Sequence, residues 1–510
     1  MKRFLLLAAI AVLFAGCSQQ RVTTCVNPLT YTDIPDPDVI RVGDDYYMIS
    51  TTMYFCPVAP IMHSRDLVHW DIVSYVTDCL NDDDVYNLRN GRNAYGKGQW
   101  AASLRYVDGV YYALFIANDQ AKTYVFRTDD ITKSNWEKTV IDRPFHDASL
   151  LFEDGRVYVV WGNGDLRITE LEPDLSAVKE GGVDQLLIAT PREGQMLRAE
   201  GAHIYHIGDY YYVLEIDWPA GGVRTETCWR SNELLGEYEP KVVLQGEFDG
   251  RSDGVAQGPI IETRDGDWYA MMFQDHGAVG RIPTLQPLRW VEDWPILGDD
   301  TIPVKEFTVN LRPSGENRVW ASDEFDSEEL DLVWQWNHKP VDSAWSLSAR
   351  PGWMRLTTSG IATGLSNARN TLTQRTVGPG CYSEVKLDAS GLKPGDHAGL
   401  CAFQSHYCAV EVESDPEGVH YLVARDYEGE IFREEITVDE VYLKLIYDFN
   451  DDVVRMAYSL DGEEWYAFEE AMEMRYTLDY FTGYRSALYN YATLEAGGHA
   501  DFDYFHQEVI

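Results

Sequence analysis

Three acidic residues occupy the same place in a hairpin motif that the sequence repeats. Asp36, Asp147 and Glu200 each stand at the head of a short hydrophobic segment, which leads through a turn containing Gly and Asp to a second segment rich in aromatic residues. Two further copies of the motif begin at Ala101 and Gln257. Equivalent positions of a repeated unit face the same region of a fold, so we expect the three carboxylates to lie close together.

Carboxylates that crowd together in a partly buried site repel one another. A protein maintains this arrangement when it needs a proton donor beside a proton acceptor. Hydrolysis of a glycosidic bond has this requirement, because an acid protonates the departing oxygen while a base or nucleophile acts on the opposite face of the sugar. Acids on nearly opposite units would stand wide apart and leave room for a water molecule, which predicts inversion. The alternative is that the acids cap turns or bind Ca²⁺.

The hairpins also predict the architecture that must position these acids. Their starting residues are spaced by roughly 46 to 65 residues, an interval typical of the four-stranded blades of a β-propeller. We therefore expect an all-β fold in which residues 26–320 form a five-bladed β-propeller with an axis narrow enough for one sugar ring. The alternative is a set of independent hairpins in a sandwich. The expected turns are Gly43–Asp44, Asp108–Gly109, Asp154–Gly155, Gly208–Asp209 and Asp265–Gly266.

The remaining third of the chain has a different pattern. A stretch rich in Pro and Gly between Pro295 and Gly315 reads as a linker. Short alternating strands with regular turns follow it and predict a C-terminal β-sandwich over residues 321–510.

Composition narrows the class of partner. The chain of 510 residues carries a formal net charge of −41, and a surface this acidic repels phosphate backbones. We therefore expect no nucleic-acid partner. The 32 tyrosines favour β structure and surfaces on which sugars stack.

The N-terminal segment is predicted to direct export. Lys2 and Arg3 precede an apolar run that is too short to span a bilayer permanently, so residues 1–16 are expected to be a signal peptide. Small residues before Cys17 resemble a bacterial lipoprotein cleavage site. Cys17 would then carry a lipid and hold the protein in the bacterial cell envelope, on the periplasmic side rather than at the cell surface. The alternative is an ordinary secreted protein.

The other cysteines do not indicate a metal centre. They are odd in number and include no CxxC pair or Cys/His ligand spacing, which argues against a zinc site. An exported protein can contain disulfides, but the spacing of these cysteines does not determine their pairing.

Five stretches together resemble glycoside hydrolase family 43, whose five-bladed propeller carries an Asp, an Asp and a Glu. On this resemblance Asp36 is the general base, Glu200 the general acid and Asp147 the residue that orients the acid and modulates its pKa. Arg281 is expected to contact the sugar. The stretches are NPL with PDPDVIR at residues 27–29 and 35–41, MHSRDLVHW at 62–70, HDAS at 146–149, AEGAH at 199–203, and GR with QPL at 280–281 and 286–288.

From Asp323 onward the chain resembles the concanavalin-like sandwich attached to the exo-acting β-xylosidases and α-L-arabinofuranosidases of this family. The resemblance implies an inverting exo-glycosidase that releases terminal non-reducing α-L-arabinofuranose from hemicellulose side chains or from arabinose- or xylose-containing oligosaccharides. A β-D-xylosidase, or an enzyme with both activities, is the alternative. An alternative of another class is a lipid-anchored glycan-binding protein without turnover.

Further residues are candidates for binding. Trp100 directly precedes Ala101 and is expected to line the channel, although an indole there could equally pack in the core. Gln257 stands where many members of the family place a His, and an amide is a poor ligand for an axial metal ion. No cofactor is expected to be required. A structural Ca²⁺ is conceivable in the sandwich near Glu324, Asp326 and Asp503, for which the alternative is ordinary acids at strand ends.

Overall fold

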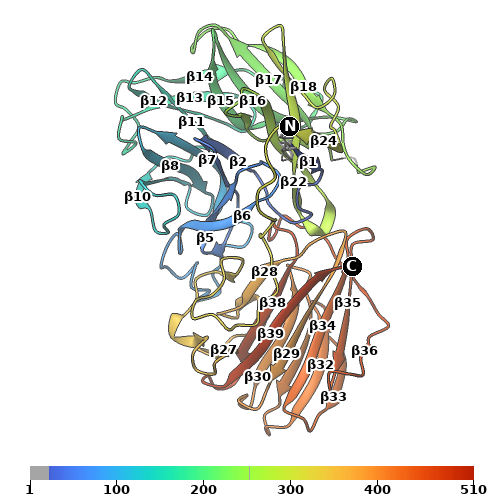
Figure 1. Ribbon diagram of the computed structural model, residues 1–510. Helices are drawn as coiled ribbons and strands as arrows, with labels where there is room; N and C mark the ends of the chain where they lie inside the picture. The colour runs from blue at the N-terminus through green and yellow to red at the C-terminus, as the bar shows by residue number, and fades with distance from the viewer. Residues whose placement is uncertain (1–21, 252) are drawn as a thin grey trace, which may run out of the picture.

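The computed structural model describes residues 22–251 and 253–510, which form two β domains in succession (Figure 1). The described residues contain short 3-10 helices and no α-helix. None of their helices has the length and apolarity needed to cross a bilayer. The predicted signal peptide, residues 1–16, and the predicted lipidation site, Cys17, lie outside the described residues.

All five predicted hairpins form as antiparallel strand pairs. Two of their turns show why the sequence places Asp before Gly. Asp108 and Gly109 have φ angles of 50° and 84°, and Asp154 and Gly155 have φ angles of 49° and 74°. Positive φ at both central residues gives a two-residue turn the twist of its strands, and Asp and Gly tolerate that conformation best.

The first domain is the predicted five-bladed propeller. Each blade is a separate antiparallel sheet that begins at the axis and continues outward, and the fifth blade splits its inner strand in two. The first blade consists of β2 (Asp38–Val42), β3 (Asp45–Ile49), β5 (Val58–Ser64) and β6 (Asp71–Thr77), and the second of β7 (Gln99–Val107), β8 (Val110–Ala117), β9 (Lys122–Thr128) and β10 (Glu137–Ile141). The third consists of β11 (Ser149–Glu153), β12 (Arg156–Trp161), β13 (Leu166–Leu171) and β14 (Asp184–Ile188), and the fourth of β15 (Gln195–Ile207), β16 (Tyr210–Pro219), β17 (Thr225–Ser231) and β18 (Glu239–Gln245). The fifth consists of β19 (Val255–Ala256), β20 (Ile260–Glu262), β21 (Trp268–Asp275), β22 (Arg281–Val291) and β23 (Trp294–Leu297).

Contacts between blades close the ring. The inner strands β2, β7, β11 and β15 touch in succession, and β20 returns to contact β2. A second closure involves the ends of the domain, where β1 (Thr23–Val26) pairs with β24 (Glu306–Val309). The stretch that reads as a linker therefore contains a strand, β24, which pairs with β1 in a separate two-stranded sheet.

The second domain is the predicted β-sandwich. Its core consists of alternating apolar side chains from two large sheets. One sheet runs β33 (Glu430–Glu435), β32 (His420–Asp426), β31 (Cys408–Ser414), β30 (Asp396–Phe403), β38 (Arg485–Ala492), β28 (Leu372–Arg375), β25 (Gln335–Asn337) and β4 (Phe55–Cys56); the other runs β26 (Trp345–Ser346), β27 (Met354–Thr357), β39 (His499–Val509), β29 (Gly380–Asp388), β34 (Glu440–Asp448), β35 (Val453–Ser459) and β36 (Tyr466–Ala467), with β37 (Met472–Glu473) also paired to β35.

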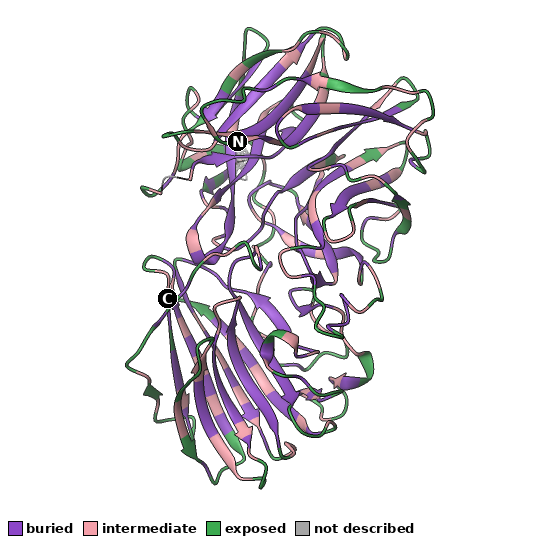
Figure 2. Cartoon of the chain, turned by 180° about the vertical axis from the view of Figure 1, so that it is seen from behind, coloured by how far each residue is buried: buried purple, intermediate pink, exposed green. Residues whose placement is uncertain are grey.

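The two domains share structure that the sequence analysis did not anticipate. Strand β4 belongs to the first blade by sequence, yet it is the edge strand of a sandwich sheet, where Cys56 pairs with Trp336. One apolar cluster also includes residues of both domains. Within it the rings of Tyr95 and Tyr480 stack in parallel, with centroids 3.9 Å apart. Most strand residues are buried, whereas exposed residues gather in the connecting loops (Figure 2).

Candidate active site

The three predicted acids come from the axis ends of three different blades. Asp36 lies two residues before β2, Asp147 lies two residues before β11, and Glu200 lies within β15. Asp36 and Asp147 are buried and have φ angles of 49° and 44°. A left-handed backbone is uncommon for residues other than Gly, and such conformations cluster at functional sites. The negative charges of Glu200 and Asp36 both act on Asp147, so the three acids form one electrostatic cluster.

Asp36 is held as a hydrogen-bond acceptor on both carboxylate oxygens. Arg281 donates from Nη1 to Oδ1 at 2.7 Å, and Gln257 donates from Nε2 to the same oxygen at 3.2 Å. The hydroxyl of Thr51 donates to Oδ2 at 2.7 Å. Burial raises the pKa of Asp36, while the Arg281 cation and the Thr51 hydroxyl oppose that rise. These contacts fix the carboxyl group in place, and its pKa lies above that of a carboxyl group in water.

His146 connects the other two acids. Its Nε2 lies 3.2 Å from Glu200 Oε2 and 3.6 Å from Asp147 Oδ2. Asn163 donates from Nδ2 to the same Glu200 oxygen at 2.7 Å. The backbone N–H of Gly201 donates to Asp147 Oδ2 at 3.1 Å, so Asp147 is bonded to the residue that follows Glu200.

The pKa values in this cluster are strongly perturbed. Burial and the charges of Glu200 and Asp36 raise the pKa of Asp147 to about 7, against the lowering effect of His146. Burial lowers the pKa of His146, but the negative charges of Asp147 and Glu200 outweigh it and raise that pKa to about 9. Carboxyl groups whose titration falls near neutral pH are characteristic of sites that move protons.

Asp38 has different hydrogen-bond partners from Asp36. Asp36 lies two residues before β2, whereas Asp38 is the first residue of that strand. The Asp38 carboxylate accepts hydrogen bonds from the backbone N–H of Leu104 at 2.7 Å and from Arg105 Nη1 at 2.8 Å. It therefore ties the first blade to the second and lies outside the cluster around Asp36.

Arg281 presents unused donors beside Asp36. It is buried, and its Nε and Nη2 have no hydrogen-bond partner within the described part of the protein. Its guanidinium lies over the rings of Phe273 and Phe481, at 5.5 and 4.8 Å from their centroids. A buried cation with free N–H groups matches the hydroxyl groups of a bound sugar, because such donors otherwise remain unsatisfied.

Trp100 lies in the same region. Its indole contacts the edges of His146 and Phe481, with ring centroids 5.9 and 5.5 Å apart, and its Nε1 lacks a partner among the residues that the structure describes. The structure thus brings Trp100, Gln257 and Arg281 together with the three acids.

Four residues of this region were missed by the sequence analysis. His146 and Thr51 could have been found from the sequence, since His146 adjoins Asp147 in the HDAS motif and Thr51 closely follows the hairpin that begins at Asp36. Asn163 and Phe481 gave no local signal. Phe481 belongs to the sandwich, where its φ of 58° marks a constrained turn before β38, and it reaches the site through domain packing.

Two of the three candidates for a calcium site in the sandwich have other side-chain partners. His506 Nε2 lies 2.6 Å from Glu324 Oε1, while Lys386 Nζ lies 3.4 Å from Asp503 Oδ2. Asp326 is exposed, and no group of potential metal ligands among the described residues combines it with the other two. Glu324 is thus paired with a histidine, Asp503 with a lysine, and Asp326 is exposed.

Two groups of potential ligands do lie close together within the described residues. One is the trio His146, Asp147 and Glu200 of the acid cluster, and the other is His397, Glu411 and Glu413 in the sandwich. In the second group Arg425 Nε lies 2.7 Å from Glu411 Oε1, so a cation already balances that carboxylate.

The chain matches two models of known protein families. The family model "Glycosyl hydrolases family 43" matches residues 25–295, which is more than half of the chain. The chain belongs to glycosyl hydrolase family 43. A second model, "Beta xylosidase C-terminal Concanavalin A-like domain", matches residues 322–508. Membership of the family makes the protein a glycoside hydrolase and leaves the binding protein without turnover unsupported.

Several relatives match this family 43 chain over most of its length. A β-xylosidase of Formosa agariphila is 28% identical over 94% of this chain and 90% of its own. A non-reducing end α-L-arabinofuranosidase of Bacteroides ovatus, BoGH43B, is 28% identical over 81% of this chain and 80% of its own. The solved structure of a bifunctional GH43-CE protein of Bacteroides eggerthii matches with a TM-score of 0.90 and 43% identity. That match covers 96% of this chain but 64% of the larger protein.

Proposed function

We propose that this family 43 hydrolase is an exo-acting, inverting glycosidase that releases a terminal pentose. The first candidate is α-L-arabinofuranose from hemicellulose side chains or oligosaccharides, and the second is β-D-xylose. The convergence of Asp36, Asp147 and Glu200 beside the unsatisfied donors of Arg281 carries the proposal. Relatives named for each sugar align with the chain at 28% identity, which supports both candidates.

The two ends of the acid cluster suit different steps of hydrolysis. Asp36 accepts hydrogen bonds from Arg281 and Thr51, contacts that suit a proton acceptor, so it is the general base that deprotonates the attacking water. Glu200 is the general acid that protonates the departing glycosidic oxygen. Asp147 is bonded to the backbone beside Glu200 and orients it. Proton NMR of the first-formed sugar should show the inverted anomer, and a retained anomer would refute attack by water.

The surroundings of the cluster suit the end of a glycan chain. Trp100 and Phe481 form an aromatic boundary, and Phe481 is contributed by the second domain. A wall of this kind admits one terminal sugar and obstructs a chain that continues past it. Sugar C–H faces pack well on aromatic rings, while Arg281 supplies hydrogen bonds to ring hydroxyls.

Substitution of the acid tests the proposal. Glu200→Gln should lower release of sugar from natural oligosaccharides by a factor of about 10²–10⁴, because an alkoxide departs poorly without a proton. Loss should be far smaller for p-nitrophenyl α-L-arabinofuranoside or β-D-xyloside, whose leaving group needs little assistance. Glu262→Gln, at an exposed position of blade five, is the matched control. Equal losses on both kinds of substrate would exclude Glu200 as the acid, and absence of wild-type activity on every pentoside would refute the function.

The location and cofactor need are proposals as well. We infer a lipid anchor at Cys17 that holds the enzyme on the periplasmic side of the cell envelope. Palmitate labelling that disappears in Cys17→Ser would support the anchor, and labelling that persists would oppose it.

The proposed steps use side chains and water, so we expect no required cofactor. Activity should survive treatment with EDTA.

A further inference from the structure

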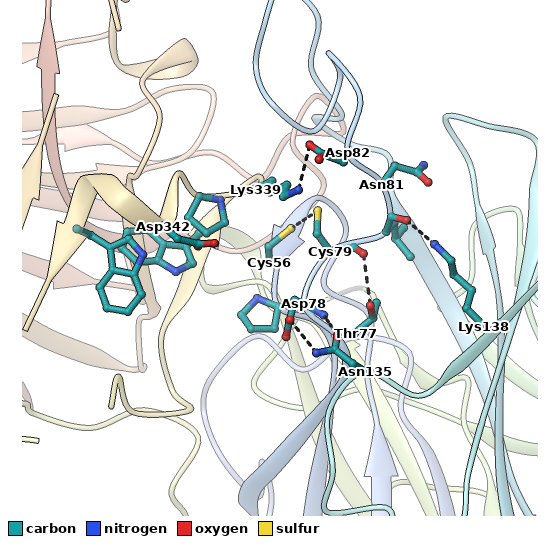
Figure 3. Close-up of a pocket in the computed structure, with 15 residues that line it drawn as sticks. Cys56, Thr77, Asp78, Cys79, Asn81, Asp82, Asn135, Lys138, Lys339 and Asp342 are labelled. Carbon is teal, nitrogen blue, oxygen red and sulfur yellow. Dashed lines mark hydrogen bonds and ion pairs between the residues drawn. The ribbon is translucent and has the colours of Figure 1, made fainter. Parts of the chain in front are cut away.

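A cavity distinct from the acid cluster opens where the first blade meets the sandwich. Its volume is about 630 Å³, and its wall includes Cys56, Cys79 and Lys138 from the propeller with Trp336 and Trp345 from the sandwich. Figure 3 shows the two cysteine side chains pointing toward each other at this wall. None of the acids or binding residues described above lines the cavity.

The two thiols are in direct contact. Cys56 Sγ lies 2.8 Å from Cys79 Sγ (Figure 3). Sulfur atoms in a disulfide lie about 2.05 Å apart, so bond formation needs an approach of less than about 1 Å. Cys56 is buried in β4, whereas Cys79 is partly exposed after β6. The five other described cysteines are buried, so Cys79 is the one with the best access to a reagent.

The surrounding contacts hold both cysteines in place. Cys56 is fixed by the pairing of β4 with Trp336 of the sandwich sheet. The loop around Cys79 is fixed on the other side, where the hydroxyl of Thr77 donates to the carbonyl of Cys79 at 3.4 Å and Asn135 donates to Asp78 Oδ2 at 2.8 Å. These contacts hold the two thiols beside each other and therefore favour pairing of Cys56 with Cys79.

We propose that Cys56 and Cys79 form a disulfide under oxidising conditions. The Cys79 thiolate attacks a disulfide oxidant such as oxidised glutathione, which releases one glutathione thiolate and leaves a mixed disulfide. The Cys56 thiolate then attacks the Cys79 sulfur and releases the second glutathione. Two protein thiols are oxidised to a disulfide, one glutathione disulfide is reduced to two thiols, and the two protein thiol protons end on those glutathione thiols.

The bond would tie the edge strand of the sandwich sheet to the first blade. Strand β4 also continues the segment that carries Thr51, the residue bonded to Asp36. The crosslink would thus anchor the outer end of a segment whose inner end reaches the general base. A closed loop restricts the unfolded chain, so the oxidised protein should be the more stable form.

The test compares the full chain after incubation with oxidised glutathione or with a reductant. Alkylation in denaturant followed by peptide mapping should find Cys56 linked to Cys79 in the oxidised sample alone, with a Tm raised by roughly 3–6 °C. Cys79→Ser should abolish this Tm difference, whereas Cys228→Ala, which removes a buried thiol of blade four, should keep it. Alkylation of both thiols in the oxidised sample, or glutathione retained on Cys79, would overturn the proposal even if a variant failed to fold.

Discussion

His146 is the residue whose charge governs the acid cluster. It lies between Asp147 and Glu200, and both of these acids raise its pKa, to about 9. At neutral pH the imidazolium therefore offsets part of the repulsion between two carboxyl groups that the mechanism requires side by side. The histidine is a positioning residue, since it acts on the substrate only through the acids that it contacts.

Removal of this charge should change the pH dependence of the enzyme. In His146→Asn the pKa of Asp147 should rise above its value of about 7, because the cation that lowers it is gone. The limb of the kcat/KM profile that reports Asp147 should therefore move to higher pH by about one to two units. Profiles of wild type and variant on the same p-nitrophenyl substrate measure the shift.

His63→Asn provides the comparison, because His63 pairs with Asp45 in blade one, outside the cluster. Its profile should coincide with that of wild type. A His146→Asn profile that stays in place, or moves to lower pH, would show that the imidazolium does not act on these acids.

Strand β15 illustrates how one element serves both scaffold and site. It carries Glu200, which pairs with Ile216 of β16 between two shifts of the pairing register, so the strand is irregular on both sides of this residue. The next residue, Gly201, has a φ of 65° and lies against the side chain of Gln257, which donates to Asp36. Gly201 therefore lies between Glu200, the proposed acid, and Gln257, which holds the proposed base Asp36.

Substitution of this glycine should damage both sides. A Cβ at Gly201 would lie 2.6 Å from Gln257 Cγ, which is too close for either side chain to stay in place. We expect Gly201→Ala to lower kcat/KM by about tenfold or more, as an error of about 1 Å in position can cost about 10² in rate. The left-handed backbone should add a loss of stability of about 1–2 kcal/mol.

Gly208→Ala separates these two effects. Gly208 directly follows the same strand with a φ of 62°, but a Cβ there meets no atom within 4 Å. This variant should lose similar stability in chemical denaturation and keep its kcat/KM. If both variants lost activity equally, contact with Gln257 would not be the cause.

The two domains of the molecule form a common core. Strand β4 lies in a sandwich sheet, and a single apolar cluster joins aromatic residues of the first blade, such as Tyr54, to sandwich residues such as Phe403 and Tyr480. Phe481 packs against this cluster and lies beside the guanidinium of Arg281. The catalytic domain thus depends on the sandwich for part of its core and for one wall of the site.

This shared core predicts cooperative unfolding. Calorimetry of the full chain should show a single transition, because loss of either domain exposes apolar surface of the other. The activity should decline over the same temperature range. Two well-separated transitions, with activity surviving the first, would show that the domains are energetically independent.

The sequence alone was sufficient to predict the repeated hairpins of this protein and the grouping of its three acids. Turns of Asp and Gly specify hairpins locally, since few other residues adopt positive φ without cost, and their recurrence predicted five blades. A repeat also places equivalent residues at one end of the axis, so the pattern by itself groups Asp36, Asp147 and Glu200. The family resemblance then suggested their roles.

Only the tertiary structure decided what surrounds those acids. The His146 imidazole, the Asn163 amide and the Phe481 ring reach the cluster from separate elements, and no local pattern encodes distances across a ring of blades or between domains. The same is true of β4, whose two residues join a sheet formed otherwise by the sandwich, and of the contact between the thiols of Cys56 and Cys79. Local sequence specifies turns and strands, whereas contacts between distant segments depend on how the whole chain packs.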